Sequence, residues 1–343
     1  MNTAAILAGI RAGRPATGPL TVHIDVTNGC NARCVTCWDH SPLLQEPRST
    51  AWKRQRLAWE DYAALTEDLA GFGSLHGIVL SGMGEPLTHP EIYRMIRHAR
   101  DRGWHVMVIT NLVAADLDAL IASGVNQLLV GVQGVTPASY TAFHPGWTEE
   151  HFFTLTRALR RLQRTPIRVR HVQVIDTHTA PELVEMVRFG RMFGADRVNY
   201  KLASLAAGTE AAAITEDQRA WMLTEGIPQA RGLATELGVH TNLELFQSQV
   251  RTGGRATAPI AEIGCSMGYV YSRVTVEGDV LYCCNTSVRV GSLREARFSD
   301  LWTGERWNAL RDALAAGRYF RGCDQCGKLE QNAKWAARLA AAP

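Results

Sequence analysis

The chain has 343 residues, a formal net charge of +3 and eight cysteines. This chain is longer than one small domain requires, and its length fits a barrel-sized domain with a smaller appendage. The basic residues are almost all arginines and are scattered, which disfavours a nucleic-acid-binding stripe, and no apolar run reaches the roughly 18 residues that span a bilayer.

Residues 1–19 precede the first expected strand as an N-terminal extension. Their short apolar stretch is followed by Arg11 and Arg14, whereas a secretory signal places its basic residues first. We therefore expect a cytoplasmic protein without nucleic-acid or membrane partners. Because that compartment keeps thiols reduced, the cysteines are expected to bind metal and not to form disulfides.

Short β-branched runs alternate with amphipathic stretches of helical length from residue 20 to about residue 203. This alternation predicts βα units around a parallel sheet. The predicted strands are Leu20–Thr27, Gly77–Ser81, His105–Thr110, Gln127–Val132, Arg168–Ile175 and Arg197–Leu202. The predicted helices are Trp59–Gly71, Pro90–Arg102, Ala115–Ser123, Thr148–Arg164 and Pro181–Phe193. Six units instead of eight predict an α/β fold that is an open, partial (β/α)6 TIM-like barrel, with functional groups at the carboxyl ends of its strands.

Three cysteines, Cys30, Cys34 and Cys37, directly follow the first predicted strand. Three thiolates can hold three irons of a four-iron cluster and leave the fourth iron open for another ligand. The alternative is a structural zinc site, in which His40 would complete a tetrahedron of three thiolates and one imidazole. A zinc site has no need of the glycine-rich motif that follows the second strand.

That motif is Gly82-Met83-Gly84-Glu85, and glycines permit a close approach of the backbone to a ligand. Together with the CxxxCxxC spacing, it resembles the radical S-adenosylmethionine (SAM) superfamily. The resemblance implies that the three cysteines bind a [4Fe-4S] cluster whose open iron holds SAM. It also implies that one electron cleaves SAM to methionine and a 5′-deoxyadenosyl radical, which removes hydrogen from an unactivated C–H bond.

The resemblance further implies which residues contact SAM. These are Gly82, Met83, Gly84 and Glu85 of the motif, Asn111 after the third strand and Gln133 after the fourth. Two departures stand out: Gly131 and Gln133 replace the serine and acid that relatives carry, and Thr36 replaces an aromatic residue. Trp38 is a candidate to take over that aromatic role, and its alternative is to cap the barrel.

The segment after residue 203 predicts a helix over 215–238, a strand over 239–245 and a linker over 251–259. A hairpin is expected from Val270–Val276 and Val280–Cys283, and a helix over Ser299–Ala316. The expected domains are thus a barrel over 20–245, a small cysteine-rich domain over 260–330 and a tail over 331–343.

Four more cysteines, Cys265, Cys283, Cys323 and Cys326, provide a closed set of thiolates. Their spacing resembles the SPASM/twitch extension of the same superfamily, in its shorter twitch form, and implies one auxiliary [4Fe-4S] cluster, so two clusters in all. A four-cysteine zinc ribbon is the alternative. Cys284 is left over, either as a small buried residue behind the cluster or as a thiol that donates a hydrogen atom.

Lys201 and His144 are the candidate bases at the barrel end, with a structural or substrate-contacting role as the alternative for each. The resemblance implies a radical SAM oxidoreductase. In the family that it resembles, enzymes that modify peptides often carry an additional N-terminal peptide-recognition domain, whereas only about 29 residues precede Cys30. We therefore expect this enzyme to act on a small polar metabolite, such as a sugar or aminocyclitol. The auxiliary cluster would accept the substrate electron.

Two other enzyme classes stay open, an epimerase and a maturase that modifies a ribosomal peptide. A non-catalytic iron-sulfur or zinc protein is the third alternative. The partners expected are a small-molecule or peptide substrate and an external one-electron reductant of the flavodoxin or ferredoxin type.

Overall fold

The described residues form a sheet of nine strands, in the order β6-β5-β4-β3-β2-β1-β7-β8-β9. The computed structural model describes residues 3–253, 260–323 and 326–342. The strands are β1 (Thr21–Asp25), β2 (Gly77–Ser81), β3 (His105–Thr110), β4 (Gln127–Gly131), β5 (Arg168–Ile175), β6 (Arg197–Leu202), β7 (Tyr271–Val274), β8 (Asp279–Leu281) and β9 (Arg289–Ser292). All six predicted strands are therefore confirmed, with ends shifted by at most two residues.

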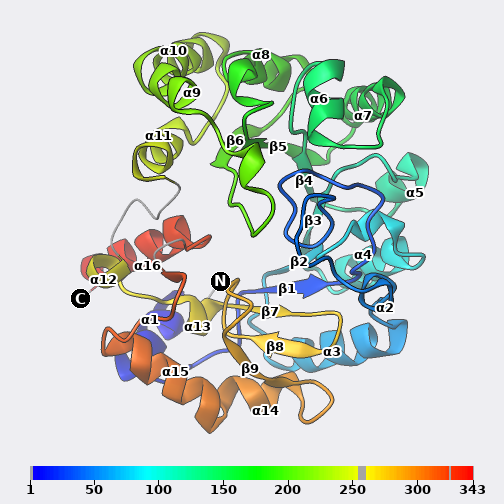
Figure 1. Cartoon of the computed structure of the whole chain (residues 1–343). Coiled ribbons are helices and arrows are strands. Elements are labelled where there is room, and N and C mark those ends of the chain that lie inside the picture. Colours follow the sequence, from blue (N-terminus) through cyan, green and yellow to red (C-terminus); the bar gives the residue numbers. More distant parts are fainter. Residues whose placement is uncertain (1–2, 254–259, 324–325, 343) are drawn as a thin grey trace.

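Strands β1 to β6 pair in parallel in sequence order, and helices run along the outside of the curved sheet (Figure 1). These helices are α3 (Trp59–Gly71), α4 (Ile92–Asp101), α5 (Leu117–Ala122), α6 (Pro137–Phe143), α7 (Glu149–Leu162) and α8 (Glu185–Met192). The parallel sheet does not close, which confirms the predicted partial barrel. Helix α6 is an addition that the sequence pattern did not predict.

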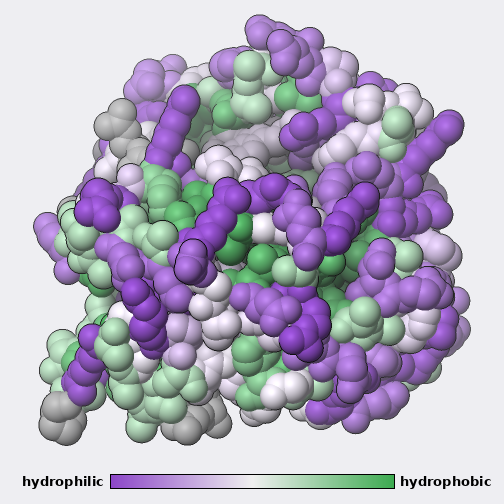
Figure 2. All heavy atoms as spheres, turned by 90° about the horizontal axis from the view of Figure 1, so that it is seen from below, coloured by the Kyte–Doolittle hydropathy of each residue, from purple (hydrophilic) through white to green (hydrophobic). Residues whose placement is uncertain are grey.

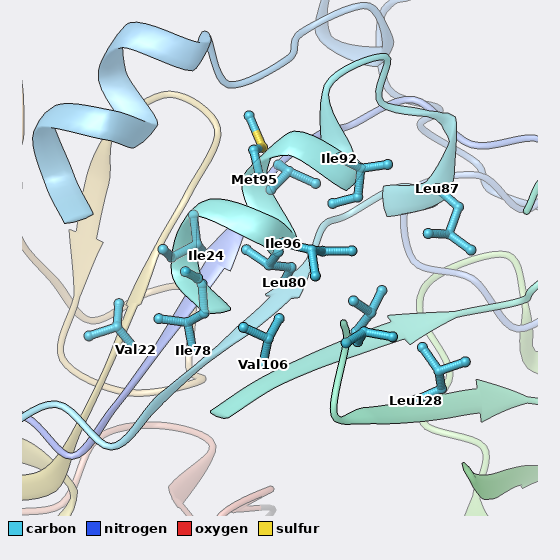
Figure 3. Packing of buried hydrophobic residues seen from close by; sticks show 14 of the residues in the cluster. Val22, Ile24, Ile78, Leu80, Leu87, Ile92, Met95, Ile96, Val106 and Leu128 are labelled. Carbon is cyan, nitrogen blue, oxygen red and sulfur yellow. The ribbon is translucent and has the colours of Figure 1, made fainter. Parts of the chain in front are cut away.

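The convex side of the sheet is the main hydrophobic core. Val22 and Ile24 of β1 share it with Ile78 and Leu80 of β2, because residues paired between parallel strands point to the same face. Figure 3 shows these side chains packed with residues of α4, including Met95. Burying one such side chain contributes about 1.5–3 kcal/mol, so this layer fixes the register of the strands.

The concave side is polar where β1 faces it. Since side chains alternate along a strand, His23 and Asp25 point away from the core that Val22 and Ile24 join. Asp25 is nonetheless completely buried. A carboxylate in such a position must find a partner, and its partner comes from the C-terminal part of the chain.

The cysteine-rich C-terminal segment extends the barrel sheet. Strand β7 pairs in parallel with β1, and β7, β8 and β9 then pair antiparallel, as Figure 1 shows in yellow and orange. The predicted hairpin is confirmed, and Gly278 in its turn has φ +87°, which favours glycine. The pairing of β7 with β1 places the two cysteine groups at one sheet.

The remaining helices pack around this extension and the open side of the barrel. They are α1 (Thr3–Ala12), α2 (Thr50–Lys53), α9 (Glu216–Trp221), α10 (Ile227–Leu237), α11 (Leu243–Thr252), α12 (Ile260–Ile263), α13 (Met267–Val270), α14 (Phe298–Thr303), α15 (Glu305–Ala315) and α16 (Leu329–Ala341). The predicted helix over 215–238 is α9 and α10 joined by one π turn. The helix predicted over Ser299–Ala316 is interrupted at Gly304, whose backbone is extended.

The strand predicted over 239–245 was wrong, since helix α11 begins at Leu243. The side chain of Asn242 instead takes the place of a neighbouring strand at the edge of β6. It accepts a hydrogen bond from Tyr200 N at 2.7 Å and donates one to Tyr200 O at 2.9 Å. Thr241 forms only an isolated bridge with Val198. Residues 239–245 therefore form no strand, despite their β propensity, because the Asn242 side chain pairs with the edge of β6.

The predicted linker over 251–259 begins within α11, and residues 254–259 lie outside the described residues. Figure 2 shows one face of the molecule, on which hydrophilic side chains cover most of the surface and apolar ones appear in patches. In the described ranges, no helix has the length and apolarity to cross a membrane. The division of the chain at residues 245 and 260 stays a prediction.

Candidate functional site

The loop that follows β1 carries Cys30, Cys34 and Cys37, all half-buried. Backbone N–H groups point at the sulfurs, from Ala32 to Cys30 Sγ at 3.4 Å and from His40 to Cys37 Sγ at 3.3 Å. Such donors stabilise the anionic form of a thiol. The loop therefore presents three sulfurs in a setting that suits metal-bound thiolates.

Burial nevertheless raises the pKa of these thiols, to about 12 for Cys30 and well above its ordinary value for Cys34. The neighbouring cysteines raise the pKa of Cys34 further. Without a cation the three groups stay protonated, and binding a positively charged metal centre would release their protons. A donor set of this kind fits an iron-sulfur cluster.

The ring of His40 is engaged by the backbone around it. Its Nε2 lies 2.9 Å from the carbonyl oxygen of Asn28, and the backbone of Met83 is a second polar neighbour of the ring. Within the described ranges, no three His, Cys, Asp or Glu side chains form a group that could hold a single metal ion. A four-iron cluster spreads its thiolates over the corners of a cube and needs no such compact group.

The glycine-rich loop after β2 packs directly on the cysteine loop. Gly84 N donates to Thr27 O at 3.1 Å, and Glu85 N donates to Gly29 O at 2.8 Å. A Cβ at Gly84 would lie 2.0 Å from Gly29 O, and one at Gly82 would lie 2.2 Å from Thr27 O. Glycine is required at both positions because the backbones of the two loops are in direct contact. The two loops together form one surface beside the cysteines.

Glu85 is buried, and both of its carboxylate oxygens accept hydrogen bonds. Its carboxylate accepts from Thr110 Oγ1 at 2.6 Å, Asn111 N at 2.7 Å and Leu87 N at 3.0 Å. Burial raises the pKa of Glu85 to about 7, against the effect of these donors. Glu85, predicted to contact SAM, thus ties the end of β2 to the end of β3 and orients the loop.

Asn111 and Gln133, the other two predicted SAM contacts, follow β3 and β4. Asn111 Nδ2 donates to Asn31 Oδ1 in the cysteine loop at 2.8 Å. Gln133 has φ +45°, and its side chain folds back over Gly131, where a Cβ would lie 2.6 Å from Gln133 Nε2. The amide of Gln133 therefore occupies the space that a side chain at position 131 would fill.

Trp38 lies at the mouth of the barrel with 57% of its surface exposed. Its Nε1 donates to Ser204 O at 2.5 Å, so the loop after the third cysteine reaches the loop after β6. Leu43, in the same loop, is 41% exposed. This hydrogen bond joins two loops at the carboxyl ends of the barrel strands. The large apolar side chains of Trp38 and Leu43 remain exposed to solvent there.

His144 lies inside a stack of rings. It is fully buried, its Nδ1 donates to Tyr140 O at 2.8 Å, and Trp147 stacks on it at 4.5 Å between ring centroids. Burial lowers the pKa of His144 to about 4. Trp147 Nε1 in turn donates to Asn31 O. This geometry favours support of the cysteine loop over a role as a base.

Lys201 is exposed near the end of β6, on the same face as Asn199. In the part of the chain that the structure describes, its side chain forms no hydrogen bond or ion pair. Of the two predicted bases, Lys201 is the one that a bound molecule can reach.

The C-terminal cysteines come from three segments of the chain, at Cys265, at Cys283 and Cys284, and at Cys323 and Cys326. The thiols of Cys326 and Cys323 are electrostatic neighbours of Cys265, and Cys265 is a neighbour of Cys283. The Cys283 and Cys284 side chains share a hydrogen bond, which raises the pKa of Cys283 and lowers that of Cys284. The structure thus brings together the four predicted ligands and also the fifth thiol.

A buried ion pair that the sequence analysis missed connects the two cysteine groups. Arg273 of β7 donates to Asp25 Oδ2 at 2.9 Å and Oδ1 at 3.1 Å, and its Nη2 lies 3.5 Å from Met83 Sδ. His23, on the same face of β1 as Asp25, has its Nδ1 3.2 Å from Tyr271 OH. The polar alternation His23-Ile24-Asp25 in an otherwise apolar strand was the signal for this pair.

Comparison with known proteins matches both parts of the chain. The radical SAM superfamily model covers residues 24–190, and an iron-sulfur cluster-binding domain, SPASM, covers residues 265–327. The chain is 24% identical over 322 residues to the PqqA peptide cyclase of Xanthomonas oryzae, and the aligned region covers 90% of this chain and 81% of that protein. It is 24% identical over 313 residues to the AdoMet-dependent heme synthase of Methanosarcina barkeri, with coverages of 86% and 85%.

The fold has a solved counterpart in Streptococcus suis SuiB, in a crystal structure bound to the precursor peptide SuiA. The TM-score is 0.65 at 15% identity, with 95% of this chain and 73% of that chain covered. At this identity the likeness concerns the fold alone. It agrees with a partial barrel extended by a C-terminal iron-sulfur domain.

Proposed function

We propose a peptide substrate for this chain, which belongs to the radical SAM superfamily and carries a C-terminal SPASM iron-sulfur domain. In this proposal the enzyme removes hydrogen from a C–H bond of the peptide and releases an oxidised peptide. The observation that carries it is the similarity to PqqA peptide cyclase, which extends over 90% of the chain.

The two domains imply [4Fe-4S] clusters and SAM as cofactors. We assign the first cluster to Cys30, Cys34 and Cys37 and the second to Cys265, Cys283, Cys323 and Cys326. When bound, the first cluster and SAM supply a 5′-deoxyadenosyl radical, and an external reductant of the flavodoxin or ferredoxin type would supply the electron.

The protein's own contribution is to hold the two loops together beside the cysteines. The backbone contact of Gly84 with Gly29 leaves no room for a side chain, and Glu85 fixes the end of β3 against the same loop. Both features support a preorganised site in which SAM lies over the cysteine loop. Preorganisation of this kind lowers the cost of positioning the reacting atoms.

The barrel mouth offers apolar contacts to a substrate. Trp38 and Leu43 are two of the large hydrophobic side chains that the described surface exposes, and both lie on the loop that reaches Ser204. Exposed apolar residues beside a catalytic site are typical of ligand or peptide binding. Lys201, on the neighbouring strand, provides a cation for a carboxylate or an amine for proton transfer.

A small metabolite, the substrate expected from the sequence, is the second candidate. One observation favours it: the relative named AdoMet-dependent heme synthase, whose product is not a peptide, matches at the same identity over a similar part of the chain. The expectation itself depended on how few residues precede Cys30, and the peptide cyclase relatives support the peptide alternative more strongly.

The test uses anaerobically reconstituted full-length protein with SAM, a one-electron reductant and peptides encoded next to its gene. We expect 5′-deoxyadenosine to form with one of these peptides, together with a peptide product lighter by two hydrogen atoms in mass spectrometry. If none of these peptides raises 5′-deoxyadenosine above the substrate-free level while a sugar or aminocyclitol does, the peptide proposal is overturned.

A further inference from the structure

Helix α16 (Leu329–Ala341), with Lys328 as its N-cap, begins three residues after the last cysteine, Cys326, and lies beyond residue 327, where the family match ends. Its residues therefore have no role assigned by the comparisons. Three of its features nonetheless face the C-terminal cysteines: an amide side chain, an ammonium group and the start of the helix itself.

The amide side chain is that of Asn332, which is completely buried. Its Oδ1 accepts a hydrogen bond from Ser266 N at 2.8 Å, so the orientation of the amide is fixed and Nδ2 points the other way. Nδ2 lies 4.0 Å from both Cys265 Sγ and Cys326 Sγ. One side chain thus directs its donor at two of the four predicted ligand sulfurs.

The ammonium group is that of Lys328, whose Nζ lies 4.1 Å from the centre of the Tyr271 ring. The ionisable groups beside its charge are the thiols of Cys284, Cys326 and Cys283, and those that bind a metal centre would become anionic. In the part of the chain that the structure describes, no carboxylate forms an ion pair with Lys328. With a cluster bound, the cysteine thiolates would therefore be its counter-charge.

The neighbouring charges on this side of the molecule are already neutralised. Arg273 is paired with Asp25, and Glu330 is paired with Lys334 at 2.8 Å. Lys328 is also the residue at the start of α16, where its backbone N–H donates to Cys326 Sγ at 3.4 Å. A helix N-terminus carries a partial positive charge, so ammonium, amide and helix act in one direction.

The N-terminal cysteines have a different electrostatic setting. The charged group beside Cys30 and Cys34 is the buried carboxyl of Glu85. Reduction adds a negative charge to a cluster, so nearby cations and N–H donors favour the reduced form, and carboxylates disfavour it. Backbone N–H donors are present at both sites, so the two sites differ in the sign of the charged side chain beside their sulfurs.

We propose that Lys328 and Asn332 raise the reduction potential of the C-terminal cluster and so make it the acceptor of an electron from the substrate radical. The proposal rests on the proposed function for the cluster and the radical. The first hydrogen atom leaves the substrate when the 5′-deoxyadenosyl radical abstracts it. The substrate radical then passes one electron to this four-iron cluster and one proton to water, so the product is lighter than the substrate by two hydrogen atoms. Lys328 and Asn332 are positioning residues in this scheme.

The test is a redox titration of the C-terminal cluster followed by electron paramagnetic resonance. The Cys34→Ala background removes the overlapping signal of the first cluster. We expect Lys328→Met to lower the equilibrium constant for reduction at least tenfold, which is about 59 mV for a one-electron couple. Asn332→Asp, which keeps the acceptor for Ser266 N, should shift the potential in the same direction, and Lys328→Arg should restore most of it.

Lys334→Met is the matched control, because it removes a positive charge from the same helix at an exposed position paired with Glu330. Equal potentials for Lys328→Met, Asn332→Asp and Lys334→Met, at full iron content, overturn the proposal. If Lys328→Met loses its iron, Lys328→Gln is titrated in its place, and loss of iron there too would assign Lys328 to assembly and reject the tuning role. The titration needs no substrate, so a wrong peptide assignment leaves its result unaffected.

Discussion

Arg273 donates two hydrogen bonds to the carboxylate of Asp25 across the pair of strands that joins the C-terminal domain to the barrel. Both side chains lie on the concave face, and the Arg273 guanidinium also reaches Met83 in the glycine-rich loop. The pair therefore connects the domain that carries the second cysteine group to the loop beside the first.

Breaking this pair from one side is expected to destabilise the protein strongly. Asp25→Asn leaves a buried guanidinium without its charge partner, which typically costs about 3–5 kcal/mol. The double variant Asp25→Leu with Arg273→Met should cost less than Asp25→Asn, because no buried charge is left unpaired. Chemical unfolding of the wild type and the two variants measures this, and a double variant that loses as much stability as Asp25→Asn, or more, would contradict the prediction.

The stability of the protein should fall as pH rises toward neutrality, in part because of Glu85. The pKa of Glu85 in the folded protein is about 7, above its ordinary value of 4.5. The folded state therefore binds the proton more tightly, and the stabilisation that is complete below pH 4.5 is lost as pH rises through about 7. The slope from one such group reaches about 1.4 kcal/mol per pH unit.

Glu85→Gln should remove this part of the slope, measured by urea unfolding of the cluster-free protein between pH 5 and 8. Its amide would also place a donor against Asn111 N or Thr110 Oγ1, which costs about 1–3 kcal/mol at every pH. Glu60→Gln, on the exposed first turn of α3, is the control and should leave the slope as it is. An unchanged slope in Glu85→Gln would assign the pH dependence to other groups.

Gly84→Ala should separate the glycine-rich loop from the cysteine loop, because its Cβ would lie 2.0 Å from Gly29 O. We expect loss of SAM binding, measured by equilibrium dialysis, with the fold retained. Gly232→Ala is the matched control: nothing lies within 4 Å of its Cβ in α10, and alanine should stabilise the helix by about 0.5–1 kcal/mol. Normal SAM binding by Gly84→Ala would refute the loop contact.

Sequence reasoning located what depends on local pattern. The strand β2 and the cysteine loop follow from short-range signals, namely β-branched runs and fixed cysteine spacings. The partnership of Asp25 with Arg273 joins residues 248 positions apart and depends on which strand lies beside β1. No local pattern specifies that neighbour, so the buried pair and the nine-stranded sheet became visible only in the structure.

The errors have the same origin. Residues 239–245 have the composition of a strand, but a single side chain, Asn242, satisfies the edge of β6 and lets α11 start at Leu243. His144 was selected as a base for its residue type and loop position. Its place in the stack with Tyr140 and Trp147 depends on helix α6, which the pattern did not predict.

The two cysteine groups should divide the chemistry between them. Wild-type protein, reconstituted anaerobically, is expected to hold about eight irons, as two four-iron clusters. Cys34→Ala should hold about half as many and form no 5′-deoxyadenosine, since the cluster that holds SAM would not assemble. Cys323→Ala should lose the same amount of iron yet keep some SAM cleavage without product. Product from both variants, or stoichiometric zinc in the wild type, would contradict the assignment.

Cys284 provides the last prediction, because it touches Cys283 and lies next to Arg273, Tyr271 and Lys328 around the second cysteine group. If Cys283 is the ligand, Cys283→Ala loses the second cluster and Cys284→Ala keeps it, so iron content distinguishes the two adjacent thiols.

Turnover in deuterated water then separates oxidation from epimerisation. A thiol that returns hydrogen to the opposite face of a substrate radical would place solvent deuterium in a product of otherwise unchanged mass, and Cys284→Ala would lose that activity. We expect instead an oxidised product without solvent deuterium at the reacting carbon, and turnover that survives Cys284→Ala, because Lys328 and Asn332 surround the neighbouring sulfurs with groups that favour electron acceptance. Deuterium in the wild-type product together with an inactive Cys284→Ala variant would establish the epimerase alternative.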